Sequence, residues 1–431
     1  MRALLYFLYN FFVIPILYCL FLIAYLFNDK IKKGIKGRKK LLKNLENDLK
    51  PFSDYQPRFW IHCSSMGEFE QSKPLIRKLK KKYPRGFVLL SFFSPSAFEH
   101  IQGYNESDYM CYLPFDSKKR SIHFISAIRP DIALIVRHDL WPNYLCELKK
   151  RNIPTVLINS TIHRNKGYEF FYQIFERVVY HNFSAIFTIS EATKRYFTEK
   201  NIYQGPIHYL GDTRYDQVIR RASDSSKVVK PLEKNINNRK VIIGGSTWPD
   251  DEQIIMEAVT QIKAQGIKIW LILIPHEPND ESLKNIEQKS NEFGLSYTKF
   301  SELDKKENTL TDMLVVDKVG VLAALYALGD ICFVGGAFGP GIHNVLEPAA
   351  HGKIIAFGPK HSNSFEAQQL KKRGVAFVVR DSNELYTLLS TTLMEPEMLR
   401  NLGKKAREIV NENVGATDRI VEQIDQLYDL S

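Results

Sequence analysis

The chain has 431 residues, of which 44% are apolar and 25% charged, and its formal net charge at pH 7 is +11. This length exceeds one ordinary domain and predicts two. The charge would suggest nucleic-acid binding, but residues 30–43 hold eight Lys or Arg and no acid, so only +3 remains elsewhere. The five cysteines are scattered without metal-ligand spacing, which excludes a disulfide framework. The basicity is one local cluster, and we expect no nucleic-acid partner.

An uncharged apolar segment, residues 3–27, precedes this cluster and is long enough to span a bilayer. It is too long for the apolar region of a signal peptide, and no small-residue cleavage site follows it. Because Lys and Arg mark the cytoplasmic side, we expect a retained single-pass anchor in the inner (plasma) membrane. The N-terminus would then face outward, and the residues after 30 would be cytoplasmic. A re-entrant or interfacial helix is the alternative.

Short apolar runs alternate with helical patterns through the rest of the chain. The strands predicted before residue 217 are Arg58–Cys63, Gly86–Phe92, Ile132–Val136, Thr155–Asn159, Ala185–Ile189 and His208–Leu210. Those predicted after residue 240 are Val241–Gly244, Ile267–Ile274, Met313–Val316, Asp330–Val334, Ile354–Phe357 and Val375–Val379. Strand–helix alternation predicts α/β architecture with doubly wound parallel sheets.

The alternation pauses at residues 220–240, a polar and basic stretch that is predicted to be a linker. It divides the chain into an anchor and basic segment at 1–45, a first domain at 46–222 and a second at 223–431. Residues 395–430 are predicted to be terminal helices. Two similar Rossmann-like domains imply a cleft between them, with ligands beyond the carboxyl ends of the strands.

A glycine-rich loop follows the predicted strand that ends at Val334. Its glycines are Gly335, Gly336, Gly339 and Gly341. A helix predicted to open near His343 would carry Asn344 and Glu347 on one face. Glycines allow close backbone approach, and a helix N-terminus attracts anions. A nucleotide site and an ordinary tight turn with a solvated polar helix start both fit this pattern.

The stretch Ser-Ser-Met-Gly-Glu at residues 64–68 follows the first predicted strand. Glu68 falls near a helix start, where the dipole and nearby N–H groups hold a carboxylate ionised. Such a carboxylate suits a general base. Ser65 and Glu68 also have the spacing of a capping box, and the isolated motif favours that capping role.

Three more polar clusters follow predicted strands. They are Arg137-His138-Asp139, Ser246-Thr247 and His276-Glu277. The first could bind an anionic sugar or orient a base, or it could be a solvated loop. The second could cap a helix whose N-terminus faces a phosphate, or be only a cap. The third lacks the further ligands that a metal needs, so no metal site is expected.

These motifs, together and in this order, resemble the 3-deoxy-D-manno-octulosonic acid (Kdo) transferases, which add Kdo to a lipid A precursor. The matching stretches are SSMGEFEQSKPLI at 64–76, LWPN at 140–143, GDTRYD at 211–216, GGSTWPDDE at 244–252 and GDICFVGGAFGPGIHNVLEPAAHGK at 329–353. The resemblance implies a GT-B glycosyltransferase fold. The N-terminal domain would hold the acceptor and the C-terminal domain CMP-Kdo.

The resemblance also implies roles for single residues. Glu68 matches the family's catalytic carboxylate, which we expect to act as the general base of an inverting transfer. The expected donor-binding residues are Ser246, Thr247, Gly335, Gly336, Gly341, Asn344 and Glu347. The chain departs from many members at Arg137, His138 and Asp139, at the loop from His276 to Asp280, and at Trp248. We therefore expect only acceptor-binding or orienting roles for Arg137, His138, Asp139, His276 and Glu277.

The expected reaction moves Kdo from CMP-Kdo to a lipid A precursor, lipid IVA, in lipopolysaccharide biosynthesis. We expect no cofactor and no obligatory metal, because backbone N–H groups near Ser246 and residues 336–343 could meet the charge of the leaving CMP. The membrane would be contacted through residues 3–27. Two alternatives remain: a GT-B transferase with another nucleotide sugar and lipid acceptor, or a membrane-tethered nucleotide-binding protein.

Overall fold

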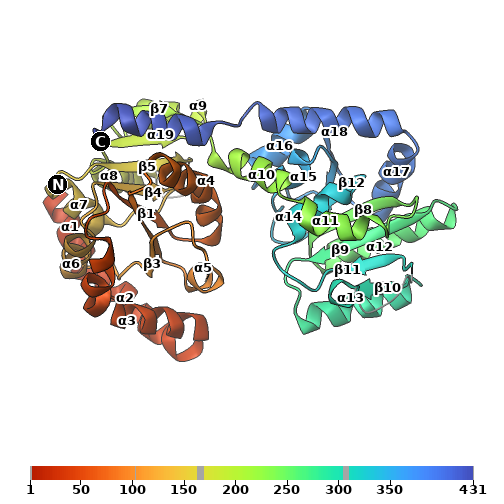
Figure 1. The fold of residues 1–431 in the computed structure, drawn as a ribbon, viewed down its shortest axis with the longest axis horizontal. Coiled ribbons are helices and arrows are strands. Elements are labelled where there is room, and N and C mark those ends of the chain that lie inside the picture. The colour runs from red at the N-terminus through yellow and green to blue at the C-terminus, as the bar shows by residue number, and fades with distance from the viewer. Residues whose placement is uncertain (1, 102, 163–168, 304–309, 431) are drawn as a thin grey trace. The chain divides into compact units, whose positions relative to one another are not determined.

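The computed structural model describes residues 2–101, 103–162, 169–303 and 310–430. It divides into two compact units, Met1–Gln217 with Val414–Ser431, and Val218–Asn413. Within the described residues each unit contains a seven-stranded parallel sheet with helices between the strands, as predicted (Figure 1).

The sheet of the first unit has the order β3-β2-β1-β4-β5-β6-β7. Its strands are β1 Arg58–Cys63, β2 Phe87–Phe92, β3 Tyr109–Tyr112, β4 Ile132–Val136, β5 Thr155–Ser160, β6 Ala185–Thr188 and β7 Ile207–Tyr209. Every residue of β1 is buried, because side chains that alternate along the strand enter two cores. Phe59 and Ile61 pack with α4 (Met66–Lys82), whereas Trp60 packs with α3 (Asp29–Leu49) and α6 (Lys118–Ile128).

Further helices of the first unit are α5 Pro95–His100, α7 Pro142–Lys150, α8 Glu169–Tyr180, α9 Glu191–Glu199 and α19 Ala416–Leu427. Helix α10, Thr213–Ser223, begins in the first unit and ends in the second. The apolar N-terminal segment is helical throughout, as α1 (Arg2–Leu8), a π-helical turn η1 (Tyr9–Val13) and α2 (Ile14–Phe27). By length and composition it could cross a membrane, and none of its described residues is buried.

The second sheet has the order β10-β11-β9-β8-β12-β13-β14. Its strands are β8 Lys240–Thr247, β9 Ile269–Pro275, β10 Tyr297–Lys299, β11 Met313–Val315, β12 Ile331–Val334, β13 Ile354–Phe357 and β14 Ala376–Val378. Its helices are α11 Ser226–Glu233, α12 Pro249–Ala264, α13 Asp280–Glu292, α14 Leu322–Leu325, α15 Leu346–Ala350, α16 Phe365–Lys372, α17 Ser382–Leu393 and α18 Pro396–Asn411. Short 3₁₀ turns lie at Lys50–Phe52, Phe300–Glu302 and Tyr326–Leu328.

The structure corrects three expectations about the chain's organisation. Strands β3 and β10 were missed, because four and three residues are too short for a hydrophobic period to be visible. The linker predicted at 220–240 is wrong: α10 continues to Ser223, and α11 follows at Ser226–Glu233. Helix α11 buries Val229 and Leu232, so this polar stretch still has an apolar face.

The third correction concerns the C-terminal helix α19, which the sequence assigned to the second domain. It belongs to the first unit, where Ile420, Val421 and Ile424 are buried in the core that contains α4. Lys78 of α4 also pairs with Asp418 at 2.7 Å. The apolar stripe of α19 needs a partner surface, and α4 supplies it.

Candidate functional site

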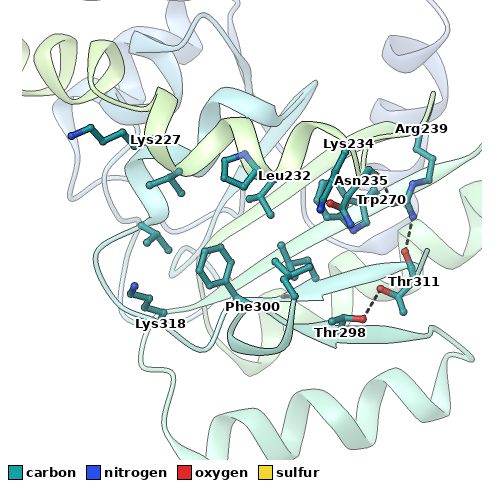
Figure 2. Close-up of a pocket in the computed structure, with 15 residues that line it drawn as sticks. Lys227, Leu232, Lys234, Asn235, Arg239, Trp270, Thr298, Phe300, Thr311 and Lys318 are labelled. Atoms are coloured by element: carbon teal, nitrogen blue, oxygen red, sulfur yellow. Dashed lines mark hydrogen bonds between the residues drawn. The ribbon is translucent and has the colours of Figure 1, made fainter. Parts of the chain in front are cut away.

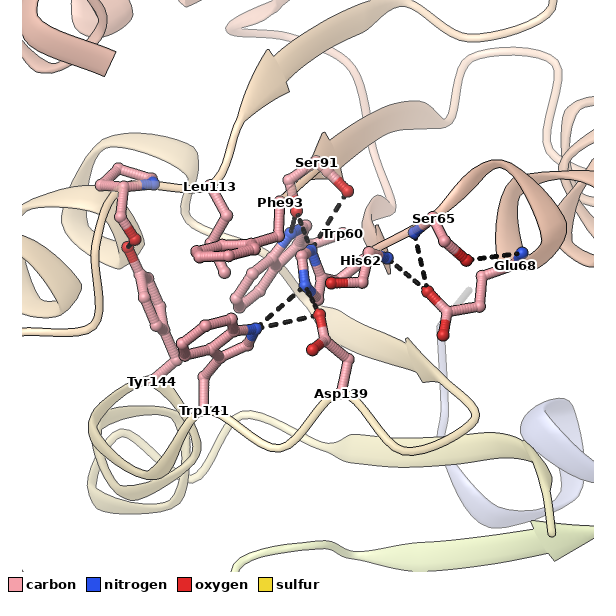
Figure 3. A network of polar contacts seen from close by, with 12 residues as sticks. Trp60, His62, Ser65, Glu68, Ser91, Phe93, Leu113, Asp139, Trp141 and Tyr144 are labelled. Atoms are coloured by element: carbon pink, nitrogen blue, oxygen red, sulfur yellow. Dashed lines mark hydrogen bonds and ion pairs between the residues drawn. The ribbon is translucent and has the colours of Figure 1, made fainter. Parts of the chain in front are cut away.

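Glu68 lies in the first turn of α4, directly after β1 (Figure 3). Its Oε2 atom accepts hydrogen bonds from the backbone N–H groups of Ser64 at 2.5 Å and Ser65 at 3.0 Å. In return, Ser65 Oγ accepts a bond from the Glu68 N–H at 3.4 Å. The capping box seen in the sequence is therefore present.

The capping bonds leave the second carboxylate oxygen available. Among the described residues, both hydrogen bonds that the Glu68 carboxylate accepts end on Oε2, and none ends on Oε1. Burial and the nearby charge of Asp139 raise the pKa of Glu68, although the two backbone N–H groups act in the opposite direction. A raised pKa makes this carboxylate a better proton acceptor, so capping and general-base chemistry are compatible here.

Asp139 is held beside Glu68 by a network that the sequence did not reveal. His62, fully buried in β1, makes a short contact through Nε2 with Asp139 Oδ2, and Trp141 Nε1 donates to the same oxygen at 2.9 Å (Figure 3). His62 Nδ1 lies 2.8 Å from Ser91 Oγ. Because indole N–H is only a donor, Asp139 must act as the acceptor in this network.

These partners decide the ionisation of Asp139. Burial by itself would raise its pKa, but the charge of His62 and hydrogen bonds from His62, Trp141 and Ser64 lower it overall. Asp139 therefore stays a carboxylate, and its negative charge acts on Glu68. The structure brings Asp139 together with Glu68, as a base-orienting role requires.

The neighbouring residues Arg137 and His138 point to different partners. Arg137 has a positive φ of 63°, and its backbone N–H donates to Ile158 O at 2.9 Å. His138 Nε2 contacts Thr161 Oγ1. Of the three predicted residues, Asp139 joins the network around Glu68.

In the second unit the glycine loop lies against the Ser246–Thr247 turn at the end of β8. A Cβ on Gly335 would overlap Ser246 O and come within 2.7 Å of Thr247 Cα, so only glycine fits without movement. Ser246 itself has a φ of 52°, which non-glycine residues rarely adopt. The predicted residues Ser246, Thr247, Gly335 and Gly336 are thus brought together.

Asp251, in the first turn of α12, joins the two loops. Its Oδ2 accepts bonds from the N–H groups of Trp248 at 2.9 Å and Gly336 at 2.8 Å. The prediction that Ser246 or Thr247 caps this helix is wrong, because Trp248 is the N-cap residue and Asp251 provides the side-chain bond. Thr247 Oγ1 instead contacts Glu252 Oε1 at 3.2 Å.

Three aromatic rings stack over this region. The His276 ring stacks on Trp248, at a centroid distance of 5.2 Å, and on His343, at 4.2 Å. Trp248 Nε1 donates to His343 Nε2 at 3.0 Å, so that nitrogen carries a lone pair and not a proton. Burial, with a smaller effect of His276, lowers the pKa of His343 to about 4. His276 is thus drawn into the loop cluster, while Glu277 is exposed.

The helix after the glycine loop begins later than predicted. Helix α15 starts at Leu346, not near His343, and its N-cap residue is Val345. Just before the helix, the Asn344 side chain accepts a hydrogen bond from the Leu346 N–H at 3.0 Å. Asn344 is exposed and lies outside the helix, so it does not share a helical face with Glu347. Glu347 is 8% exposed and accepts a bond from Arg221 at 2.7 Å.

A further cavity of about 330 Å³ lies in the second unit, between α11 and the sheet (Figure 2). Four cationic side chains line it: Lys227, Lys234, Arg239 and Lys318. The Arg239 guanidinium lies over the Trp270 ring, 5.2 Å from its centroid. None of the predicted site residues lines this cavity. Across the described ranges, no group of three His, Cys, Asp or Glu is placed to hold a metal.

Comparisons with known proteins agree with the motifs. Residues 34–217 match the family model described as 3-deoxy-D-manno-octulosonic-acid transferase (kdotransferase). A protein named 3-deoxy-D-manno-octulosonic acid transferase from Rickettsia bellii is 26% identical over 98% of this chain and 99% of its own length. The protein of that name from Haemophilus influenzae is 27% identical over 84% of this chain and 85% of its own. The chain is therefore similar to the Kdo transferases over most of its length.

Another similar protein has a longer chain. A bifunctional glycosyltransferase/methyltransferase from Fusobacterium nucleatum is 28% identical over 81% of this chain, which spans only 54% of that protein. Solved structures confirm the GT-B fold. A UDP-GlcNAc 2-epimerase from Neisseria meningitidis has a TM-score of 0.61 at 13% identity, covering 86% of this chain and all of that one. A glycosyltransferase from Rickettsia africae has a TM-score of 0.57 at 12% identity, covering 87% and 100%.

Proposed function

We propose that the protein transfers Kdo from CMP-Kdo to a lipid A precursor, lipid IVA, with inversion at the anomeric carbon. The observation that carries the proposal is Glu68, a carboxylate with a raised pKa at the carboxyl end of β1, set beside the ionised Asp139. Similarity to proteins named 3-deoxy-D-manno-octulosonic acid transferase supports Kdo as the transferred group, and the resemblance of the motifs supports CMP-Kdo as donor and lipid IVA as acceptor.

In the proposed reaction Glu68 accepts the proton of the acceptor hydroxyl. The hydroxyl oxygen forms a bond to the anomeric carbon of Kdo while the bond from that carbon to the CMP phosphate oxygen breaks. General-base assistance of this kind is worth roughly 10²–10⁴-fold in rate. Asp139 favours the proton on Glu68 by its charge, and His62 holds Asp139 in place.

The donor would bind in the second unit at the loops joined by Asp251. We propose donor contacts for Ser246, Thr247, Gly335, Gly336, Gly341, Asn344 and Glu347. Backbone N–H groups of these loops would meet the charge of the departing CMP, with no obligatory metal or cofactor. His276 stacks on Trp248 and His343 and is exposed, so we propose that it is the imidazole of this cluster that meets an anion.

The test of the reaction is mass spectrometry of the product formed by purified full-length protein from CMP-Kdo and a tetraacyl lipid A precursor. A mass increase of one or more Kdo residues supports the proposal and counts the transfers. No product, or transfer from a UDP- or GDP-sugar instead, overturns it. Binding of CMP without any turnover would favour a nucleotide-sensing protein.

The test of the base is Glu68→Gln, with Glu70→Gln as the matched control two residues along the same helix. Glu68→Gln should lower kcat roughly 10²–10⁴-fold, because the amide cannot accept the hydroxyl proton. Glu70 pairs with Lys73 and is not next to Asp139, so its variant should keep transferase activity. Equal rates for the two variants would remove Glu68 from the mechanism.

We also propose that the reaction takes place at the cytoplasmic face of the inner membrane, where a lipid acceptor is available. The apolar helix of residues 2–27 and the exposed lysines that follow it support this location.

A further inference from the structure

The N-terminal apolar helix is attached to the first unit by polar side chains, which we call the polar latch. Tyr9 Oη donates to Asp116 Oδ2 at 2.8 Å. The amides of Asn10 and Asn143 exchange two hydrogen bonds, at 3.0 and 2.9 Å. The latch also includes the bond from Asn182 Nδ2 to Tyr6 Oη at 2.9 Å.

The latch residues on the unit are themselves built into its interior. Asp116 is 1% exposed and also accepts bonds from the backbone N–H groups of Asn143 and Tyr144, at 3.1 and 3.2 Å. Asn143 also donates to Asp116 O at 2.9 Å. Losing the helix would leave part of this buried polar cluster without partners, which is costly. Asn10, a polar residue that is unfavourable in a membrane span, is hydrogen-bonded to Asn143 here.

Aromatic contacts continue the attachment along the helix. Tyr18 packs edge-on against Phe115 at 5.9 Å, and Phe21 packs against Phe93 and Phe115 at 5.8 and 5.1 Å. From Tyr6 to Phe21 the helix follows the unit for about 22 Å, at ~1.5 Å per residue. Residues 6–21 thus lie along the unit and are not surrounded by lipid, as a crossing of the ~30 Å hydrocarbon core of a bilayer would require.

The opposite side of the helix presents apolar side chains. Apolar side chains of this helix that are more than half exposed include Leu4, Phe7, Phe11, Ile16, Leu20 and Ile23. Helix α3, which follows directly, exposes lysines: Lys30, Lys33, Lys36, Lys39 and Lys40. The exposed apolar side chains would contact lipid, and the row of lysines would contact the headgroups of an anionic bilayer.

We propose that residues 2–27 lie in the plane of an anionic lipid bilayer as an interfacial helix, latched to the first unit, with both ends on the same side of the membrane. This goes beyond the proposed function, since it holds for any membrane-bound reaction. It replaces the single-pass anchor expected from the sequence with the interfacial alternative.

The attachment also links the lipid surface to the candidate base. Phe93, which the helix contacts through Phe21, packs on Trp141 at 4.5 Å. Trp141 in turn donates to Asp139, beside Glu68. The bilayer would therefore border the part of the first unit that holds the carboxylate, where a lipid acceptor can arrive without leaving the interface.

The first experiment places a short protease-cleavable tag before Met1 of the full chain. Membrane vesicles of both orientations are prepared from expressing cells and treated with the protease. Cleavage only where the cytoplasmic side is exposed is the expected result. Cleavage only from the other side would show that the helix crosses the membrane and would overturn the proposal.

The second experiment tests the latch in the same membranes. Asn10→Cys combined with Asn143→Cys, in a Cys19→Ser and Cys146→Ser background, should form an intramolecular disulfide on mild oxidation. The matched control pairs Asn143→Cys with Phe7→Cys, on the exposed side of the same helix, and should link at least tenfold less. Linked peptides are quantified by mass spectrometry.

Equal linking by the two pairs, or links only between chains, would overturn the proposal; the latter would mean that a second copy covers the helix. Neither readout depends on transferase activity, so a failed transferase assay leaves this test intact.

Discussion

Gly335→Ala tests whether the glycine loop must lie against the Ser246–Thr247 turn. The new Cβ would overlap Ser246 O and sit 2.7 Å from Thr247 Cα, where 3.4–4 Å is ordinary contact. Both atoms are backbone, so no side-chain rotation relieves the overlap. Overpacking of this kind costs about 1–3 kcal/mol, and we expect the upper part of that range here.

The loop and the turn should therefore move apart, which weakens nucleotide binding as well as the fold. For a unit of this size, about 2–3 kcal/mol lowers the melting temperature by roughly 4–12 °C. The matched control is Gly339→Ala in the same loop, where the new Cβ would lie 3.8 Å from its nearest neighbour, the backbone oxygen of Gly336. Thermal unfolding and calorimetric titration with CMP measure the two effects. Equal melting temperatures and CMP affinities for the two variants would refute the reasoning.

Three further outcomes are expected. Burial raises the pKa of Glu252 from 4.5 to about 7, so ionisation of this carboxylate lowers the free energy of unfolding as pH rises through that window. The free energy of unfolding of Glu252→Gln, measured with urea, should exceed that of wild type by up to about 3 kcal/mol at pH 8 and by little at pH 4. Asp139→Asn removes the charge that raises the pKa of Glu68, so the acid limb of the kcat profile should move to lower pH; an unmoved limb contradicts the assignment. Trp248→Phe frees His343 Nε2, so NMR titration should show a higher His343 pKa; an unchanged value would exclude control by the indole.

The strands were predictable wherever they were long and apolar. Strand β1 matches its predicted bounds, because a strand buried on both faces must be apolar throughout. Glu68 and Ser65 were also recognisable, since a capping box is a local pattern of four residues. Local signals of this kind can be recognised in the sequence because they do not depend on contacts with distant residues.

The partners of Glu68 were not predictable in the same way. His62 looks like one more residue of a buried strand, and its partner Asp139 is 77 positions away. They meet because β1 pairs with β4, although β2 and β3 come between them in the chain. A polar residue inside an apolar strand was the one available signal.

Asn344 and the polar stretch at 220–240 failed for a different reason. The side chain of Asn344 bonds the backbone two residues on, which moves the helix start to Leu346. The polar stretch forms helices because Val229 and Leu232 find a surface to cover. In both places a tertiary or side-chain contact outweighed a local propensity.

The sequence by itself determined the parallel α/β architecture, the motifs at the strand ends and the resemblance to the Kdo transferases, because these depend on local hydrophobic patterns and short motifs. Tertiary structure decided which strand ends are neighbours, and so which side chains tune Glu68. Tertiary contacts also place α19 in the first unit and hold the N-terminal helix against that unit's surface. Length and hydropathy alone favour a membrane span over an interfacial helix. Buried partners such as Asp116 and Asn143 distinguish them, and only the folded chain brings those partners to Tyr9 and Asn10.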